Sequence, residues 1–197
     1  MKRGNVESQE QTASQPQAAA DARRPDAVGH LIFWPIVVIG IAADLISKHA
    51  IFAWLQTVPD RQYEVINGIF RLVMWENDGA AFSIAEGRTT LLLTVSAIAL
   101  VVVLAIFLFG QVHHRVMQVA LGLFTAGITG NLYDRAFNDG YVRDFLLFSW
   151  KGHHWPAFNI ADSMLCTAVG LLILVNITSA FSRKPAHQQT AAHPDPH

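Results

Sequence analysis

Two aspartates flank the start of the last long apolar stretch of the chain. Asp144 lies ahead of this stretch and Asp162 lies at its beginning. Two carboxyl groups in one partly desolvated site do not readily ionise together, so the pKa of one rises while the other stays ionised. Such a pair can activate water as a base and then protonate a leaving amine as an acid. Asp144 and Asp162 are therefore candidate catalytic residues of a hydrolase. The alternative is that each caps a helix or pairs with Arg135 or Arg143.

Other polar residues lie at the same ends of the apolar stretches. Asp44 and Lys48 are four residues apart, as in a helical ion pair. Asp134 and Arg135 are adjacent and point to different helix faces, so we expect separate partners and a scaffold role for Asp134. Three amide side chains could orient the aspartates or the substrate, with ordinary helix capping as the alternative: Asn77, Asn131 and Asn159. The last candidate is Gly79, a glycine that permits close approach of the backbone.

Long apolar segments must position these motifs. A membrane-spanning helix needs about 20 largely apolar residues. Segments of this kind cover residues 31–55, 89–110, 116–133 and 163–182. If the chain crosses the membrane up, down, up and down, every motif falls at the same membrane face. Charged residues near hydrocarbon are costly, so their collection at one face indicates a functional site.

The composition agrees with a membrane protein. The chain has 197 residues, of which 52% are hydrophobic and 15% are charged, against about 25% charged in a typical soluble domain. The formal net charge of −1 gives no support for nucleic-acid binding. The single cysteine, Cys166, excludes an internal disulfide, and we expect its thiol to be buried and inert. The histidines lack a zinc-binding pattern, and we expect neither a metal nor a cofactor.

The predicted fold is a mainly α membrane protein with four transmembrane helices and a small β-rich surface element between the first two. A turn at Asn67-Gly68 between β-prone runs indicates a hairpin there. The connection that contains Trp150 and Trp155 suits the membrane interface. We predict a disordered extension over residues 1–28, a membrane domain over 29–182 and a disordered tail over 183–197. Seven basic residues on one side against six on the other weakly favour cytoplasmic termini.

The ordered set of motifs resembles bacterial lipoprotein signal peptidase, also called signal peptidase II, over residues 31–181. The similarity lies in five motifs: Asp44…Lys48, Asn77-x-Gly-Ala-Ala-Phe-Ser83, Gly130-Asn-Leu-x-Asp-Arg135, Gly140-x-Val-x-Asp-Phe145 and Phe158-Asn-x-Ala-Asp-Ser163. The motifs are weak singly and specific in this order. The resemblance implies a membrane aspartic endopeptidase that cuts diacylglyceryl-modified prolipoproteins just before the lipidated cysteine.

Carried over by motif, the resemblance implies that Asp144 and Asp162 are the catalytic dyad. The other candidates then support or line the site. It also implies a multi-pass protein of the bacterial cytoplasmic membrane, with the site near the outer face, both termini in the cytoplasm, and membrane lipid around it. Cyclic peptide antibiotics such as globomycin are the expected inhibitors. We expect a monomer.

The chain departs from the family pattern near Asp144. The spacing from Asp134 is one residue longer, with Asn138-Asp139 before Gly140, which a loop can absorb. Arg143 stands where relatives often have an apolar residue, and an inward-turned side chain would lower the pKa of Asp144.

Other functional classes fit less well. Presenilin-like proteases also use paired aspartates, but the chain has no Gly-x-Gly-Asp motif. An ion-coupled transporter needs polar residues threaded across the membrane, and these cluster at one end. A noncatalytic scaffold leaves the carboxylates unexplained.

Overall fold

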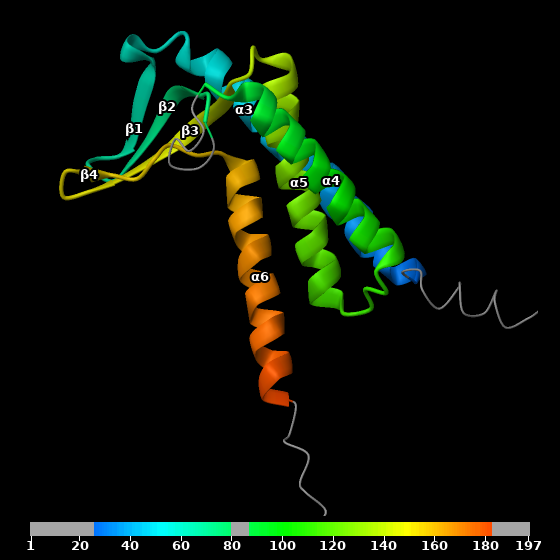
Figure 1. The fold of residues 1–197 in the computed structure, drawn as a ribbon. Coiled ribbons are helices and arrows are strands. Elements are labelled where there is room, and N and C mark those ends of the chain that lie inside the picture. Colours follow the sequence, from blue (N-terminus) through cyan, green and yellow to red (C-terminus); the bar gives the residue numbers. More distant parts are fainter. Residues whose placement is uncertain (1–25, 80–86, 183–197) are drawn as a thin grey trace, which may run out of the picture.

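The computed structural model describes residues 26–79 and 87–182 of the chain. Long helices alternate in direction, and a small sheet projects from one end of them (Figure 1). Each of the helices is long and apolar enough to cross a membrane, which confirms the predicted four spans. They are α3 (Ala27–Leu55), α4 (Thr89–Phe109), α5 (Arg115–Phe137) and α6 (Ile160–Ser182).

Helix α3 begins just before the predicted domain boundary at residue 29. Asp26 caps it, since its carboxylate accepts a hydrogen bond of 2.8 Å from the Gly29 N–H. The same carboxylate binds both terminal nitrogens of Arg115, at 2.8 and 2.6 Å. Because Arg115 starts α5, this pair joins the first turns of α3 and α5 at the end of the bundle opposite the sheet (Figure 1).

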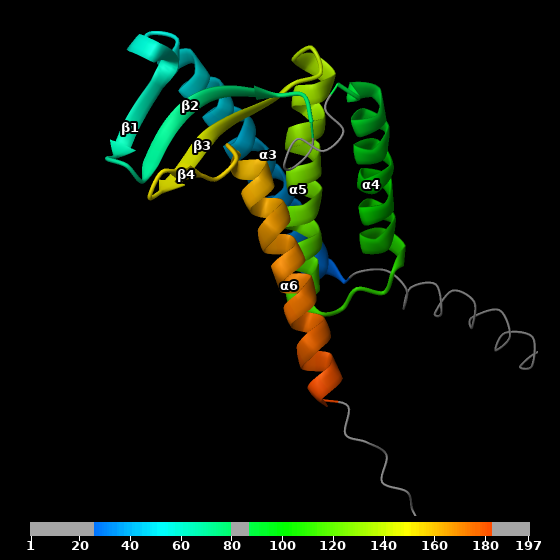
Figure 2. The same cartoon turned by 60° about the vertical axis from the view of Figure 1, so that its left-hand side comes forward.

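Helix α5 lies at the centre, between α4 and α6 (Figure 2). Glycines on its buried face let the neighbouring helices approach closely. A Cβ on Gly127 would lie 2.7 Å from the backbone oxygen of Ala161 in α6, and one on Gly130 would collide with the Asp44 carboxylate of α3. Small residues at helix contacts are the usual means of packing helices within a membrane. In this chain they also bring polar side chains of three helices together.

The prediction of a buried Cys166 is wrong, because its side chain is exposed on α6. Large apolar side chains of the helices are exposed as well, such as Leu31, Val101 and Ile173, which are 73%, 66% and 53% exposed. Lipid tails are as apolar as these side chains, so apolar sequence neighbours do not imply burial within a membrane protein.

The predicted hairpin is confirmed. It consists of β1 (Gln62–Ile66) and β2 (Phe70–Asn77), which pair antiparallel. Gly68 has φ of +71° at the turn, a conformation that favours glycine, and its N–H donates to the Glu64 carboxylate at 2.8 Å.

The sheet is larger than the sequence indicated. The connection after α5 adds β3 (Val142–Trp150) and β4 (His153–His154), and the strand order is β1-β2-β3-β4. In the β2–β3 register, Trp75 lies opposite Asp144. The backbone oxygen of Phe158 accepts hydrogen bonds from the N–H groups of Phe145 and Leu146, at 3.0 and 2.9 Å. This joins β3 to the residues just before α6.

Candidate active site

Asp144 and Asp162 approach the same region from two different elements. Asp144 lies on β3 and is 1% exposed, and Asp162 lies in the first turn of α6. The hydrogen bonds from β3 to Phe158 hold the strand against the start of this helix. The two aspartates, eighteen positions apart in the sequence, are therefore fixed by one short structural unit.

Asn159 links the two carboxyl groups. Its side-chain amide donates to Asp144 Oδ1 at 2.7 Å, and its side-chain oxygen accepts from the Asp162 N–H at 2.9 Å. The Asp162 carboxylate in turn accepts from the Asn159 N–H at 3.2 Å. The two contacts between Asn159 and Asp162 are of the reciprocal kind that begins a helix. Asn159 therefore serves as a helix cap and also as a bridge between Asp144 and Asp162.

Asn131 approaches from α5 and holds the other side of Asp162. Its amide nitrogen donates to Asp162 Oδ1 at 2.8 Å. Its oxygen accepts from Lys48 Nζ and from the Asn159 amide, each at 3.1 Å. The side chain is thereby oriented by two donors, which leaves its own N–H₂ group directed at the carboxylate.

Asn77, at the end of β2, contacts Asp144 from the opposite side. Its amide nitrogen donates to Asp144 Oδ2 at 2.9 Å, while its oxygen accepts from the Gly79 N–H at 2.9 Å. The Gly79 carbonyl accepts a bond of 2.7 Å from the Arg135 guanidinium. Gly79 thus connects Asn77 to the adjacent cation. The next residues of this motif, Ala80, Ala81 and Ser83, lie outside the described residues.

A buried network of charged side chains contacts the residues of the site. Lys48 lies 2.7 Å from the Asp44 carboxylate, the ion pair expected from their spacing, and 3.2 Å from Asp134, and all three side chains are fully buried. Asp44 also accepts a bond of 2.8 Å from the Ala161 N–H, one residue before Asp162. Buried charges need such partners, since an unpaired one is strongly destabilising. The network connects α3, α5 and α6.

Arg143 completes this network, and its side chain does not turn towards Asp144, the condition under which it would lower the pKa of that residue. Its guanidinium lies 2.6 Å from Asp134 Oδ1, and its backbone N–H donates to Asp134 Oδ2 at 3.0 Å. The side chain therefore turns to Asp134 and not to Asp144. The pairing ties the residue immediately before Asp144 to α5, a positional role that sequence reasoning missed. The separate partners of Asp134 and Arg135 agree with the prediction.

Burial dominates the electrostatics of Asp144. Loss of water around the carboxyl, together with the nearby charge of Asp162, raises the pKa of Asp144 from 3.8 to about 7. The hydrogen bonds from Asn77 and Asn159 act in the opposite direction, because they favour the ionised form. A carboxyl of this kind exchanges a proton near neutral pH, as general acid–base catalysis requires.

Both aspartates line one cavity of about 1180 Å³. Asn77, Asn131 and Arg135 also line it, and the sheet supplies a wall through residues that we did not predict: Val73, Met74, Trp75, Val142 and Leu147. Only the pairing of β2 with β3 brings these residues together. Towards the membrane the lining includes Ser96 of α4, Ile128 of α5, and Leu165 and Cys166 of α6.

Every predicted site residue that the structure describes belongs to this arrangement. Asp44, Lys48 and Asp134 form the adjacent buried charge network, and the others contact or surround the carboxylates. Within residues 26–79 and 87–182, no group of three or more His, Cys, Asp or Glu side chains is arranged to hold a metal ion. Chemically, the site offers one buried carboxyl with a raised pKa, a second carboxyl and a nearby guanidinium, all at a cavity large enough for a peptide.

Comparison with known proteins yields consistent matches. A family model described as signal peptidase II matches residues 36–178. The lipoprotein signal peptidases of Francisella tularensis subsp. novicida and Clostridium novyi are 34% and 35% identical to the chain, covering 75% and 71% of it and 92% and 91% of their own lengths. Two solved bacterial membrane enzymes superpose with TM-scores of 0.70 and 0.66, at 30% and 32% identity, covering 82% and 79% of this chain and 95% and 97% of theirs.

Proposed function

Because the chain belongs to the signal peptidase II family, we propose that this multi-pass membrane peptidase is an aspartic endopeptidase that processes prolipoproteins. It removes the signal peptide from diacylglyceryl-modified substrates by cutting just before the lipidated cysteine. The observation that carries the proposal is that Asp144 and Asp162 line one cavity and are joined by hydrogen bonds of the Asn159 side chain.

In the proposed mechanism the two carboxyl groups share one proton. The ionised group takes a proton from water, whose oxygen attacks the scissile carbonyl carbon, while the protonated group donates its proton to the carbonyl oxygen. When the tetrahedral intermediate collapses, the C–N bond breaks and the first group gives its proton to the leaving amine. The second group takes a proton back from a hydroxyl of the intermediate as the product carbonyl forms, which restores the shared proton. The raised pKa of Asp144, about 7, suits it to carry the shared proton. No covalent intermediate forms.

The neighbouring residues orient this pair. Asn77 and Asn159 hold the two oxygens of Asp144, and Asn131 holds Asp162. Arg135 stands beside the cavity as a fixed positive charge that stabilises the developing negative charge on the substrate oxygen. Asp44, Lys48 and Asp134 hold α3, α5 and α6 together beside this pair through their buried contacts.

The membrane side of the cavity supports lateral entry of the signal helix. Helices α4 and α6 are separated by α5 (Figure 2), and the cavity reaches residues of all three helices. An apolar helix in the bilayer can therefore present its outer end to the carboxylates without leaving the lipid. The family assignment and the weak excess of basic residues at the termini favour a site near the outer face and cytoplasmic termini. Cyclic peptides such as globomycin are proposed to occupy the same cavity.

A carboxylate-based ion transporter is less well supported. Its polar residues need to form a path across the membrane. In the described part of this chain the buried Asp44, Lys48 and Asp134 instead gather towards the sheet end of the helices. Helix α4 contains no charged residue between Thr89 and Phe109, so it offers no carboxylate to such a path. We therefore propose no transport function.

The experiment that tests the proposal uses the purified full chain in detergent or lipid. A diacylglyceryl-modified prolipoprotein and its unmodified counterpart are incubated with it, and mass spectrometry locates the new N-terminus. We expect cleavage of the modified substrate alone, with the lipidated cysteine as the first residue of the product. Cleavage elsewhere, equal cleavage of both substrates, or no cleavage would refute the proposed function.

A further inference from the structure

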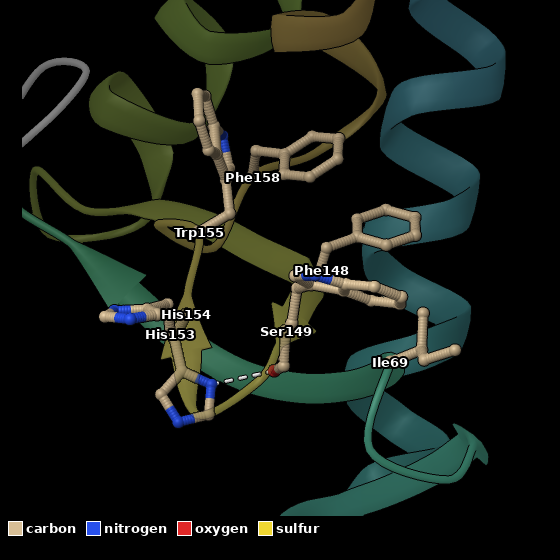
Figure 3. Close-up of a pocket in the computed structure, with 8 residues that line it drawn as sticks. Ile69, Phe148, Ser149, His153, His154, Trp155 and Phe158 are labelled. Atoms are coloured by element: carbon tan, nitrogen blue, oxygen red, sulfur yellow. Dashed lines mark hydrogen bonds between the residues drawn. The ribbon is translucent and has the colours of Figure 1, made fainter.

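A second pocket lies beside the catalytic cavity, on the hairpin that β3 and β4 form (Figure 3). Its volume is about 550 Å³, within the range of small-molecule sites. The wall is largely aromatic. It is formed by Ile69, Phe148, Ser149, Trp150, His153, His154, Trp155 and Phe158. We call it the aromatic side pocket.

The chemistry of the aromatic side pocket suits an apolar occupant. Phe148 stacks on Phe158, with ring centroids 5.9 Å apart, and on Phe70 of β2 at 4.8 Å. The Ser149 hydroxyl lies 2.7 Å from His154 Nδ1, so these two polar groups satisfy each other (Figure 3). Among its lining residues there is no Asp, Glu, Lys or Arg. The pocket can therefore bury hydrocarbon without leaving a charge unpaired.

The aromatic side pocket adjoins the catalytic cavity. His154, Trp155 and Phe158 line both of them. Phe158 directly precedes Asn159, the residue whose side chain binds Asp144 at 2.7 Å. An occupant of the pocket is thus held next to the residues that position the catalytic pair.

The pocket also lies next to the start of a helix that can span a membrane. Phe158 comes two residues before α6, which is apolar enough to span the bilayer. Trp150 and Trp155 remain 65% and 60% exposed, and tryptophan is enriched where lipid headgroups meet the acyl chains. Both features favour a position of the pocket near the glycerol of a membrane-anchored lipid.

We propose that the aromatic side pocket binds one acyl chain of the diacylglyceryl group on the substrate. The proposal rests on the proposed function and names how that substrate is recognised. The lipid is attached to the cysteine that follows the cut bond, so a chain in the pocket fixes the bond near the carboxylates. The pocket wall replaces neighbouring lipid as the surroundings of this chain, so binding gains van der Waals contacts that increase with the length of chain in the pocket. Acyl-chain length is therefore the property that the pocket measures.

The test narrows the pocket without touching the catalytic residues. Ile69 and Ile66 lie on the same hairpin and are 38% and 52% exposed, but only Ile69 lines the pocket. We compare Ile69→Trp with the matched control Ile66→Trp, using one lipopeptide sequence that carries either two long or two short acyl chains. For Ile69→Trp we expect KM to rise about threefold for the long-chain substrate, which loses several van der Waals contacts with the pocket wall, and to stay unchanged for the short-chain one. The Ile66→Trp protein should behave as the parent.

Several results would overturn the subsite. One is a parent enzyme with the same KM for the long-chain and short-chain substrates. Another is an Ile69→Trp protein whose KM changes equally for both substrates, as loss of a peptide subsite or of general membrane anchoring would cause. If Ile69→Trp does not fold, Trp150→Ala opens the same wall and should weaken the chain-length preference. An unaltered preference in Trp150→Ala would also refute the proposal.

A direct probe separates this idea from the proposed function. A diacylglyceryl cysteine with a diazirine near the middle of one acyl chain is photolysed on the full chain in lipid, and labelled peptides are mapped. Labelling within residues 148–158 that decreases in Ile69→Trp supports the subsite even if the parent cleaves no prolipoprotein. Labelling confined to the outward faces of the helices overturns the subsite, whatever the enzyme cleaves.

Discussion

Removing the hydrogen bond from Asn77 should move the pH dependence of cleavage. The Asn77 amide donates to Asp144 Oδ2 at 2.9 Å and favours the ionised carboxylate. Its loss in Asn77→Ala therefore raises the pKa of Asp144. If Asp144 carries the shared proton, activity falls as pH rises through this pKa, so the alkaline limb of the kcat/KM profile should move upward.

The structure also sets the size of the shift. A hydrogen bond to a charged group contributes roughly 1.5–3 kcal/mol, and one pKa unit corresponds to about 1.36 kcal/mol. The bond is partly buried, and Asn159 still donates to the other oxygen at 2.7 Å. We therefore take the lower value and expect the alkaline limb to move up by about one unit, starting from about 7 in the parent.

The assay is initial-rate cleavage of a diacylglyceryl-modified prolipoprotein across a series of buffers. Asn176→Ala is the matched control, because the Asn176 amide bonds within α6, to the Leu172 carbonyl at 3.0 Å. Its profile should superpose on that of the parent. A limb that stays in place in Asn77→Ala, or that moves to lower pH, would refute the assignment of the shared proton to Asp144.

The buried charges lead to three further predictions. Lys48→Met leaves Asp44 and Asp134 without their shared cation and should cost about 3–5 kcal/mol of unfolding free energy, which thermal unfolding in detergent measures. Adding Asp44→Asn to Lys48→Met should recover part of this loss. A Lys48→Met protein as stable as the parent would contradict the stabilising role of the buried ion pairs. Arg143→Gln breaks the contact with Asp134 and should lower kcat about tenfold by displacing Asp144, with partial rescue in Arg143→Lys. If Arg143→Gln and Arg143→Lys lower kcat equally, Arg143 does not position Asp144 through its charge. Finally, the raised pKa of Asp144 means that the folded state holds a proton that the unfolded state has released between pH 3.8 and about 7. Stability should fall as pH rises through this window, and Asp144→Asn should flatten that decline. An unchanged slope would contradict the burial argument.

The sequence was informative where burying a charged group is costly. Asp44, Asp134 and Asp162 stand in or beside apolar spans, so each needed a partner, and the ends of alternating helices were the only common meeting place. The hairpin at Asn67-Gly68 was equally predictable, because its turn geometry restricts the residue types.

Contacts between distant strands were not predictable in this way. The β2–β3 register that places Trp75 opposite Asp144 leaves no local pattern, and neither does the pairing of Arg143 with Asp134. The connection that contains Trp150 and Trp155 was interpreted as an interfacial loop, whereas it forms the β3–β4 hairpin and lines a pocket. Periodicity identifies elements, but pairing partners depend on the tertiary fold.

The central claim is that Asp144 and Asp162 together carry out the cleavage. The most direct measurement compares the parent with Asp144→Asn and Asp162→Asn on a diacylglyceryl-modified prolipoprotein, with Asp139→Asn in the turn before β3 as the matched control. Asparagine keeps the shape of the side chain but neither ionises nor donates as an acid. We predict that both site variants fold and lose at least about a hundredfold in kcat, whereas Asp139→Asn keeps parental activity. Near-parental cleavage by either folded site variant would contradict the account.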